Sequence, residues 1–342
     1  AKAKAEAEAK AKAEAYERQW TKLIYKNISF NGLVGFSEDG DFSRLPNRIS
    51  DKLRNPLKQL EKHTAGGVAK FKTTSSKLRI VAKFSSIRRA HMNDIITNGV
   101  DIYVNGRYHK SIFSNKAKFD KEIIIPVIGE KKIDVYFPLY GHVKDINFYV
   151  EVDAASRIAD SEKKTIVFYG SSITQGCCAS NPSMSFPAII SRKLEVNQVN
   201  LGFSGNGLGD LELAEFIAEL NPDIIVLDYW ANPDPQSYKE TLPLFIKKIR
   251  SKQKKIVILV TSTFSNPGRE KYQRLKDEIS KQTVKFFKDE KDNYIYFIDE
   301  LLKEDETSGL IDGRHLNSYG FSIVAERLTN FIKKNNLLNP KN

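Results

Sequence analysis

The second half of the chain alternates short apolar segments with longer amphipathic ones, from about residue 164 to residue 337. The apolar segments have the length and continuous hydrophobicity of strands buried on both faces, and the longer ones have a helical period. This order of elements predicts a parallel sheet covered by helices on both faces. The expected strands are 165–169, 198–201, 223–229, 255–261 and 294–298, and the expected helices are 185–194, 210–220, 237–251, 270–287 and 318–334.

The preceding part of the chain, residues 22–155, has a different pattern. Short runs rich in β-branched and aromatic residues alternate with turn signals, and Asn105-Gly106 between two such runs is typical of a hairpin. One helix is expected at 50–62. The spacing predicts a β-sandwich that ends in the polar stretch 154–164. Its expected strands include 77–84, 100–104, 122–128, 133–137 and 146–152.

Residues 1–15 alternate alanine with lysine or glutamate, and opposite charges recur four residues apart. Both features favour a solvated helix, which we interpret as a linker, tag or self-association element. Three parts are thus expected: a leader at 1–20, a β-sandwich at 21–157 and an α/β domain at 158–342. No signal peptide is recognised, although one could have been removed, so a secreted location stays open beside a slightly favoured cytoplasmic one.

Charge and cysteine content exclude several classes of protein. The net charge is +12, but residues 16–160 hold 25 basic and 16 acidic residues while 161–342 hold 25 and 23. This surplus suits an anionic glycan or surface, and without an arginine–aromatic ladder we expect no nucleic-acid partner. No apolar run is long enough to span a bilayer. The two cysteines, Cys177 and Cys178, are adjacent, which excludes a disulfide scaffold and a cysteine-rich zinc site, and we expect them to be packing residues.

Four short stretches after predicted strands carry residues suited to acyl chemistry. Ser172 lies in a tight turn after the first strand, and the glycine-rich stretch 202–209 follows the second. Asn232 follows the third strand and could donate its amide to an oxyanion. The spacing of Asp312 and His315 lets one loop place a carboxylate against an imidazole. Taken singly, each stretch is equally compatible with a turn, a flexible loop or a surface histidine.

In the order Ser, Gly, Asn, His, the four stretches resemble the SGNH (GDSL-like) hydrolase family over about residues 164–337. The resemblance implies a flavodoxin-like, three-layer α/β/α fold. It also implies that Ser172 is the nucleophile, His315 the general base and Asp312 the residue that orients it. The backbone N–H groups of Ser172 and Gly205 and the side chain of Asn232 would form the oxyanion hole. No metal or cofactor is implied.

One position departs from the family pattern. The first block often reads Gly-Asp-Ser, and here Ser171 replaces the aspartate, which makes Ser171 a rival nucleophile by position. The register of the block favours Ser172. Tyr229 and Trp230 flank the predicted site and could stack on a sugar, although core packing explains them equally well.

The first half carries a second resemblance. Residues 99–103 (GVDIY) are similar to the Gly-x-Asp-Leu-Tyr signature of a small, jelly-roll-like β domain that precedes certain SGNH hydrolases. The stretches 42–46, 63–66 and 137–140 are similar to neighbouring parts of such proteins. Members with this arrangement include proteins assigned as carbohydrate O-acetylesterases. The alternative is that these residues are only sandwich core and turns.

The sequence therefore predicts a serine esterase that removes a small acyl group, acetyl above all, from a carbohydrate. Two alternatives stay open: a short-chain lipid esterase or acyltransferase, and a glycan-binding protein with an inactive hydrolase domain. The acyl acceptor and the oligomeric state are not specified by these patterns.

Overall fold

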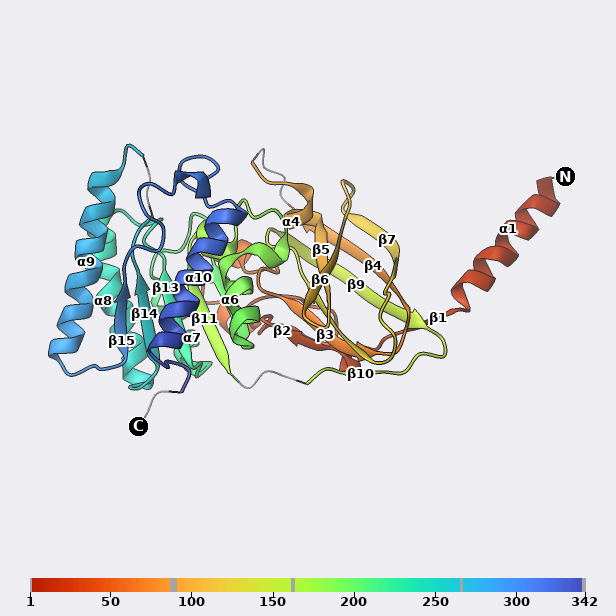
Figure 1. Cartoon of the computed structure of the whole chain (residues 1–342), viewed down its shortest axis with the longest axis horizontal. Helices are drawn as coiled ribbons and strands as arrows, with labels where there is room; N and C mark the ends of the chain where they lie inside the picture. Colours follow the sequence, from red (N-terminus) through yellow and green to blue (C-terminus); the bar gives the residue numbers. More distant parts are fainter. Residues whose placement is uncertain (1, 87–90, 161–163, 265–266, 340–342) are drawn as a thin grey trace.

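A computed structural model describes residues 2–86, 91–160, 164–264 and 267–339. Two antiparallel sheets lie in the first part of the chain, here called the β half (residues 18–160), and one parallel sheet lies in the α/β half (residues 164–339) (Figure 1). The change in periodicity near residue 160 thus marks a change from antiparallel to parallel pairing. The mixed α/β fold class expected from the sequence is confirmed.

The parallel sheet has five strands, in the spatial order β12-β11-β13-β14-β15. Numbered along the chain, this order is 2-1-3-4-5, the flavodoxin-like arrangement of a doubly wound sheet. The crevice beside its first strand, at the carboxyl ends, is the usual ligand position in such sheets. The strands are β11 (Thr165–Gly170), β12 (Asn197–Gly202), β13 (Ile224–Asp228), β14 (Val257–Thr261) and β15 (Ile295–Ile298), all paired in parallel.

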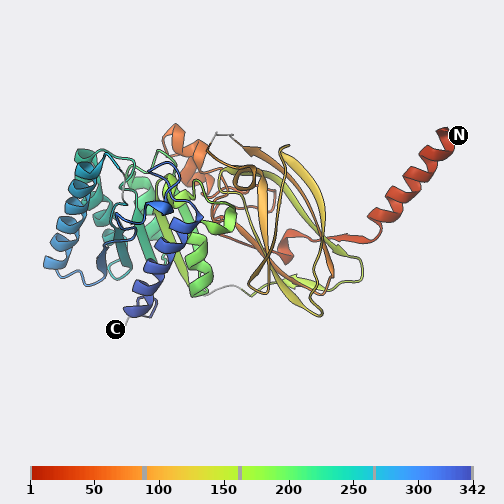
Figure 2. The ribbon, with the colours of Figure 1, turned by 45° about the horizontal axis from the view of Figure 1, so that its top comes forward.

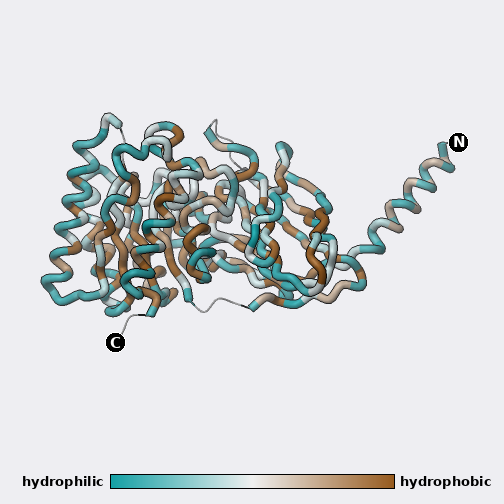
Figure 3. Tube along the Cα trace, viewed as in Figure 1, coloured by the Kyte–Doolittle hydropathy of each residue, from teal (hydrophilic) through white to brown (hydrophobic). Residues whose placement is uncertain are grey.

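Helices cover both faces of this sheet, because the strands are apolar on both sides and each helix has one apolar stripe. One face carries α6 (Phe186–Leu194) against α10 (Ser318–Lys334). The other carries α8 (Pro235–Lys252), which packs between α7 (Leu211–Glu219) and α9 (Glu270–Asp289) (Figure 1). Figure 3 shows hydrophobic strands inside and mostly hydrophilic turns on the outer helices. The result is the expected three-layer arrangement.

The two antiparallel sheets of the β half bury their inner faces against each other in one apolar cluster, which fits the expected β-sandwich. Both turn residues between Val104 and Arg107, Asn105 and Gly106, have positive φ (49° and 76°), as the sequence cue requires. One sheet contains β1 (Trp20–Lys22), β9 (Gly141–Glu151), β4 (Lys77–Ser86) and β7 (Lys118–Ile124). The other contains β10 (Ser156–Ile158), β3 (Val68–Thr73), β8 (Lys131–Tyr136), β5 (Gly99–Val104) and β6 (Arg107–Phe113), with β2 (Ser29–Asn31) also paired to β3.

Two of the differences between the predicted and the observed β half have a clear local cause. The helix expected at 50–62 is divided into α2 (Asn47–Ser50) and α3 (Asn55–Leu60). Arg54 is extended and Pro56 lies in the first turn of α3, so a new helix begins there instead of continuing the first. The strand expected at 122–128 is β7, which begins and ends four residues earlier because it pairs with β4 in that register.

The apolar core of the α/β half extends into the β half. Side chains from the segment 45–65, with three more from later in the β half, belong to the same buried cluster as the parallel sheet. The domain boundary between residues 157 and 158 therefore remains a prediction. The apolar core is shared by residues on both sides of it. The β-half members of this cluster are Leu45, Ile49, Leu53, Leu57, Leu60, Ala65, Ile96, Leu139 and Tyr140.

The leader forms α1 (Lys2–Glu17), a helix with no buried residue that projects away from the rest of the chain (Figure 2). The alternation of alanine with charged residues thus lies on a helix that is exposed on all sides. Its C-terminal end contacts the four-stranded sheet through an ion pair between Glu17 and Arg79 at 2.9 Å. Within the described ranges, neither α1 nor any other helix combines the length and apolarity needed to cross a membrane.

Candidate active site

The turn that follows β11 holds two adjacent serines with different surroundings. Ser171 caps α5 (Ser172–Gln175): its Oγ accepts a hydrogen bond from the N–H of Ile173 at 3.1 Å, and the residue is fully buried. Ser172 is the first residue of the helix, and its Oγ lies 3.0 Å from Nε2 of His315. The cap explains why a serine can stand where the family often has aspartate, since both side chains cap helices well.

His315 comes from the loop that precedes α10 and is held by Asp312. Nδ1 of His315 lies 2.7 Å from Oδ2 of Asp312, and the backbone N–H groups of Arg314 and His315 donate to Oδ1. Burial acts to raise the pKa of Asp312, but these hydrogen bonds outweigh it and lower the pKa to about 2. Asp312 is therefore ionised at neutral pH. The structure thus brings Ser172, His315 and Asp312 into one chain of contacts.

The glycine-rich stretch after β12 is bound to the end of β13. Oδ1 of Asn232 accepts a hydrogen bond from the N–H of Gly207 at 3.0 Å, which leaves its amide nitrogen to donate elsewhere. Gly205 has φ +71°, a conformation that other residues adopt only at a cost, although a side chain there would meet no neighbour. These contacts place Gly205 and Asn232 in one connected loop system. Their donor roles toward an oxyanion remain a prediction.

A buried carboxylate connects the strands below the site. Asp228, at the end of β13, accepts hydrogen bonds from the hydroxyls of Thr174 and Thr261 and from the indole N–H of Trp230, at 2.7–2.9 Å. Burial raises the pKa of Asp228 to about 6, against the opposing effect of these three donors. The carboxylate thus fixes α5, the helix that Ser172 begins, to the ends of β13 and β14.

Gln175, the last residue of α5, hydrogen-bonds to both halves of the molecule. Its amide nitrogen donates to the carbonyl of Leu139 and lies 3.0 Å from Nδ1 of His63, both in the β half. Its amide oxygen accepts from the N–H of Ser204, in the glycine-rich stretch. The buried side chain of Gln175 therefore links the β half to the loop that carries Gly205.

Two arginines of the β half also hold the glycine-rich stretch. Arg44 is fully buried and donates to the carbonyls of Asn200 and Gly202, with its guanidinium 4.7 Å from the ring centroid of Phe203. Burial lowers its pKa to about 10. Arg54 donates to the side chain and carbonyl of Asn206 and forms a forked ion pair with the carboxylate of Asp210. Both ends of the stretch are therefore tied to the β half.

The signature-like segment GVDIY contributes two of these cross-contacts. Asp101 is fully buried and accepts from the side chain of Asn181 and the N–H of Ser183, each at 2.7 Å. The hydroxyl of Tyr103 donates to Oγ of Ser183 at 3.1 Å. These residues thus do more than pack the sandwich, because they bind the segment that follows α5 in the chain.

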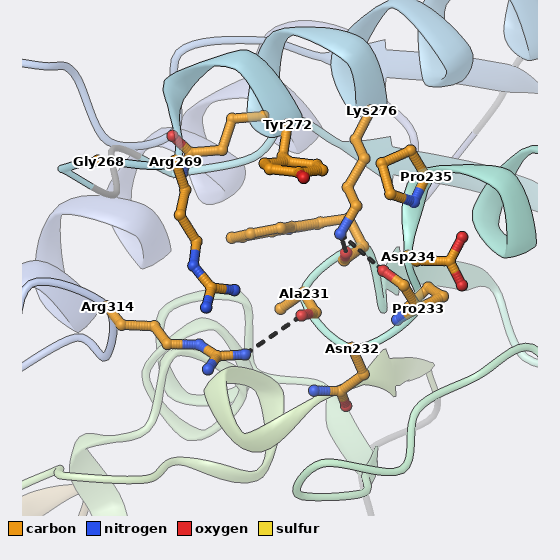
Figure 4. A pocket seen from close by; sticks show the side chains of 12 residues that line it. Ala231, Asn232, Pro233, Asp234, Pro235, Gly268, Arg269, Tyr272, Lys276 and Arg314 are labelled. Atoms are coloured by element: carbon orange, nitrogen blue, oxygen red, sulfur yellow. Dashed lines mark hydrogen bonds between the residues drawn. The ribbon is translucent and has the colours of Figure 1, made fainter.

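A pocket of about 440 Å³ opens beside Asn232 (Figure 4). It lies between the loop after β13, the start of α9 and the loop that carries His315. Trp230 lines it, as its predicted substrate role requires, while Tyr229 does not: the tyrosine is fully buried among aromatic rings, with its hydroxyl 3.2 Å from that of Thr241. Arg269 and Arg314 also line the pocket.

The adjacent cysteines, Cys177 and Cys178, come just after α5 in the chain. Their sulfur atoms are 3.0 Å apart but form no disulfide, and both side chains are buried. The hydrogen bond with Cys178, together with burial, raises the pKa of Cys177, so this thiol stays protonated and is a poor nucleophile. His91 lies close to both sulfur atoms and stacks on His315 with ring centroids 6.0 Å apart.

Most of the residues that support the site were not predicted from the sequence. Arg44 and His63 lie in stretches already similar to relatives, so the resemblance was a usable signal that gave no role to either. Arg54 and Arg269 stand in ordinary polar surroundings, and no spacing rule connects them to the site.

A flavodoxin-like sheet with a serine, a histidine and an aspartate in contact beyond its strand ends is the arrangement expected of an SGNH-type serine hydrolase. The chain belongs to the GDSL-like lipase/acylhydrolase family, whose model matches residues 163–333, and it is by class a carboxylic ester hydrolase. Residues 18–156 match the GxDLY domain, described as the N-terminus of SGNH-hydrolase-type esterases. Both resemblances inferred from the sequence are confirmed. No curated protein matches the chain.

Several solved structures are similar over most of their length. A candidate GDSL-like lipase from Bacteroides ovatus is 26% identical, with a TM-score of 0.84 over 92% of this chain and 97% of that one. The salicylyl-acyltransferase SsfX3, from a tetracycline biosynthetic pathway, is 17% identical (TM-score 0.79, 90% and 95% covered). A family two carbohydrate esterase from Clostridium thermocellum, solved with cellohexaose, is 16% identical, with a TM-score of 0.64 over 80% of this chain and 94% of that one. At such low identity the last two show the common fold.

Proposed function

We propose that the protein is a serine esterase that removes acetyl groups from a carbohydrate through an acyl-enzyme. The observation that carries the proposal is the continuous contact from Oγ of Ser172 to Nε2 of His315, and from Nδ1 of His315 to Asp312. A serine hydroxyl is a weak nucleophile without such a base, and the base needs a partner that fixes its tautomer.

The first half-reaction forms the acyl-enzyme. Oγ of Ser172 attacks the ester carbonyl carbon while Nε2 of His315 takes the hydroxyl proton. Asp312 is already ionised and stabilises the imidazolium. The carbonyl oxygen becomes an oxyanion, toward which the N–H groups of Ser172 and Gly205 and the amide of Asn232 are the proposed donors. The C–O bond to the sugar breaks, and His315 returns its proton to the leaving oxygen.

The second half-reaction repeats these steps with water. His315 takes a proton from a water molecule, whose oxygen attacks the acetyl-serine carbonyl. The tetrahedral intermediate then releases acetate, and the proton returns to Oγ of Ser172. Every proton transfer uses Nε2 of His315, so the contact of Nδ1 with Asp312 can persist through the cycle.

The carbohydrate part of the proposal is supported by the names of similar structures. Besides the esterase solved with cellohexaose, they include an acetyl xylan esterase from Butyrivibrio proteoclasticus, 12% identical with a TM-score of 0.62. The pocket beside Asn232 has room for a sugar-sized group, and an exposed tyrosine lines it.

The proposal is tested with p-nitrophenyl acetate and with acetylated oligosaccharides. The wild-type protein should release p-nitrophenol and acetate, and Ser172→Ala should lower kcat by at least about 10³-fold, because the nucleophile is lost. Ser180→Ala, which alters an exposed serine outside the contact chain, is a matched control and should retain full activity. Full activity of Ser172→Ala would refute the assignment.

A second candidate is an acyltransferase, favoured by the similarity to SsfX3 over 90% of the chain. Adding an alcohol acceptor to the assay distinguishes the two: a transferase gives a new ester in place of the free acid. A lipid esterase would prefer longer acyl chains in a chain-length series. A glycan-binding protein with an inactive domain would bind oligosaccharide yet resist labelling by a fluorophosphonate.

A further inference from the structure

The pocket beside Asn232 carries positive charge that protein carboxylates do not neutralise. Arg269, at the start of α9, and Arg314, between Asp312 and His315 in the chain, extend their guanidinium groups toward each other over Ala231 (Figure 4). Within the described ranges neither guanidinium forms an ion pair. The Arg314 side chain donates a hydrogen bond to the carbonyl of Ala231, at 3.4 Å.

Other charged groups of the pocket are already engaged. Lys276 donates to the carbonyls of Trp230 and Pro233, at 2.8 and 2.7 Å. Asp234 is the one carboxylate among the lining residues, and it caps α8 by accepting from the N–H groups of Gln236 and Ser237. Burial lowers the pKa of Lys276 to about 8, and the charges of Arg314 and Arg269 act in the same direction. The pocket thus has an excess of positive charge.

The position of this charge relates it to the reaction. Asn232, the proposed oxyanion donor, lines the same pocket, and Arg314 precedes His315 directly in the chain. A substrate whose ester carbonyl lies against Asn232 would thus extend a neighbouring substituent into this pocket. Tyr272, 59% exposed, also lines the pocket and offers an aromatic surface on which a sugar ring can pack.

We propose that this pocket holds an anionic substituent of the substrate, so that the protein prefers acetylated sugars that carry a carboxylate, sulfate or phosphate. This inference rests on the proposed function. A guanidinium fork binds planar or tetrahedral anions through two parallel hydrogen bonds, and such charge-assisted bonds are about twice as strong as neutral ones. A cleft lined by one sign of charge also concentrates substrates of the opposite sign.

The test compares substrates that differ only in charge. Acetylated methyl glucoside is assayed beside its uronate, its 6-sulfate and its 6-phosphate, and acetate release gives kcat/KM for each. We expect at least one anionic substrate to exceed the neutral one by about tenfold, mainly through KM, and the excess to shrink as salt is added. The arm with the largest excess identifies the anion.

Variants then locate the preference. Arg269→Gln and Arg314→Gln should each reduce the anionic-to-neutral ratio of kcat/KM several-fold, and Arg314→Lys should retain part of it because the charge stays while the fork is lost. Lys271→Gln removes an exposed charge from the same helix outside the pocket and should leave the ratio unchanged.

The two proposals fail in different ways. Equal kcat/KM for neutral and anionic sugars, or a ratio that neither arginine variant alters, would overturn the anionic site while p-nitrophenyl acetate is still hydrolysed. Absence of hydrolysis of p-nitrophenyl acetate and all the sugars would instead overturn the esterase proposal.

Discussion

The α/β half carries the side chains proposed to react, whereas the β half contacts the same loops through buried polar side chains. Ser172 and Asn232 follow strands β11 and β13 of the parallel sheet, and His315 precedes α10, which packs on that sheet domain. Arg44 and Asp101, from the β half, instead bind backbone atoms of the segments around them. One half thus supplies the chemistry, and the other restricts where its loops can lie.

This difference bears on what the β half does. A binding module attached by a linker would contact its neighbour through a modest and rather polar interface. Here the segment 45–65 completes the core of the α/β half, and a fully buried guanidinium spans the contact. We infer that the two halves fold as one unit and that the β half helps to hold the proposed oxyanion loop in place.

The largest expected effect comes from removing the buried cation at this contact. Arg44→Met should lower the free energy of unfolding by about 3–5 kcal/mol, because three carbonyl acceptors and the nearby Glu61 lose their positive partner. Urea unfolding followed by circular dichroism measures the change. Arg48→Met is the matched control: its exposed ion pair with Glu219 also joins the halves and should contribute less than about 1 kcal/mol.

A change in unfolding free energy no larger than that of Arg48→Met would contradict the inference that the two halves fold as one unit. If the variant unfolds in two separate transitions, with that of the α/β half unchanged, the halves are independent units. A single transition shifted to lower urea would agree with one cooperative unit.

The elements that were predictable from the sequence have strong local patterns. The five parallel strands and five long helices follow from continuous apolar runs and helical periods, and Ser172 and His315 from motif order. The division of residues 47–60 into two helices was missed because the hydrophobic pattern continues across Arg54 while the backbone does not.

The unpredicted part of the site depends on contacts between residues far apart in sequence. Arg44 and Gly202 are separated by 158 positions, and Asp101 and Ser183 by 82. No local period encodes such pairs, and a buried arginine has the same sequence appearance as an exposed one. Ser171 and Ser172 were likewise distinguishable only by register until the structure showed which one caps the helix.

The second prediction concerns how the free energy of unfolding depends on pH through Asp228, a buried carboxylate of the α/β half. The pKa of Asp228 is about 6 in the folded protein and ordinarily 3.8, so between these values the folded state binds more protons than the unfolded state. Its contribution to stability is therefore present below about pH 4 and lost as the pH rises through 6. Relative to Asp228→Asn, the wild-type protein should lose on the order of 2–3 kcal/mol of unfolding free energy across this range.

Urea unfolding of both proteins at several pH values across this window provides the measurement. Asp153→Asn, at an exposed position of the β half, should follow the wild-type curve. A difference between wild type and Asp228→Asn that does not vary with pH would contradict the assigned burial effect.

The smallest expected effect concerns the loop itself. Arg54→Lys keeps the charge but loses the fork that holds Asp210 and Asn206 together. Because Asn206 follows Gly205, the proposed donor should become less well placed, and kcat for p-nitrophenyl acetate should fall about three- to tenfold, equivalent to about 1 kcal/mol of barrier. KM should change less, since the ester reaches the loop mainly in the transition state. Arg48→Lys, which also links the halves but touches α7 through Glu219, should leave both constants unchanged. Equal losses in the two variants would mean that the β half acts through general stability, whereas a loss confined to Arg54→Lys would show that it acts on the loop.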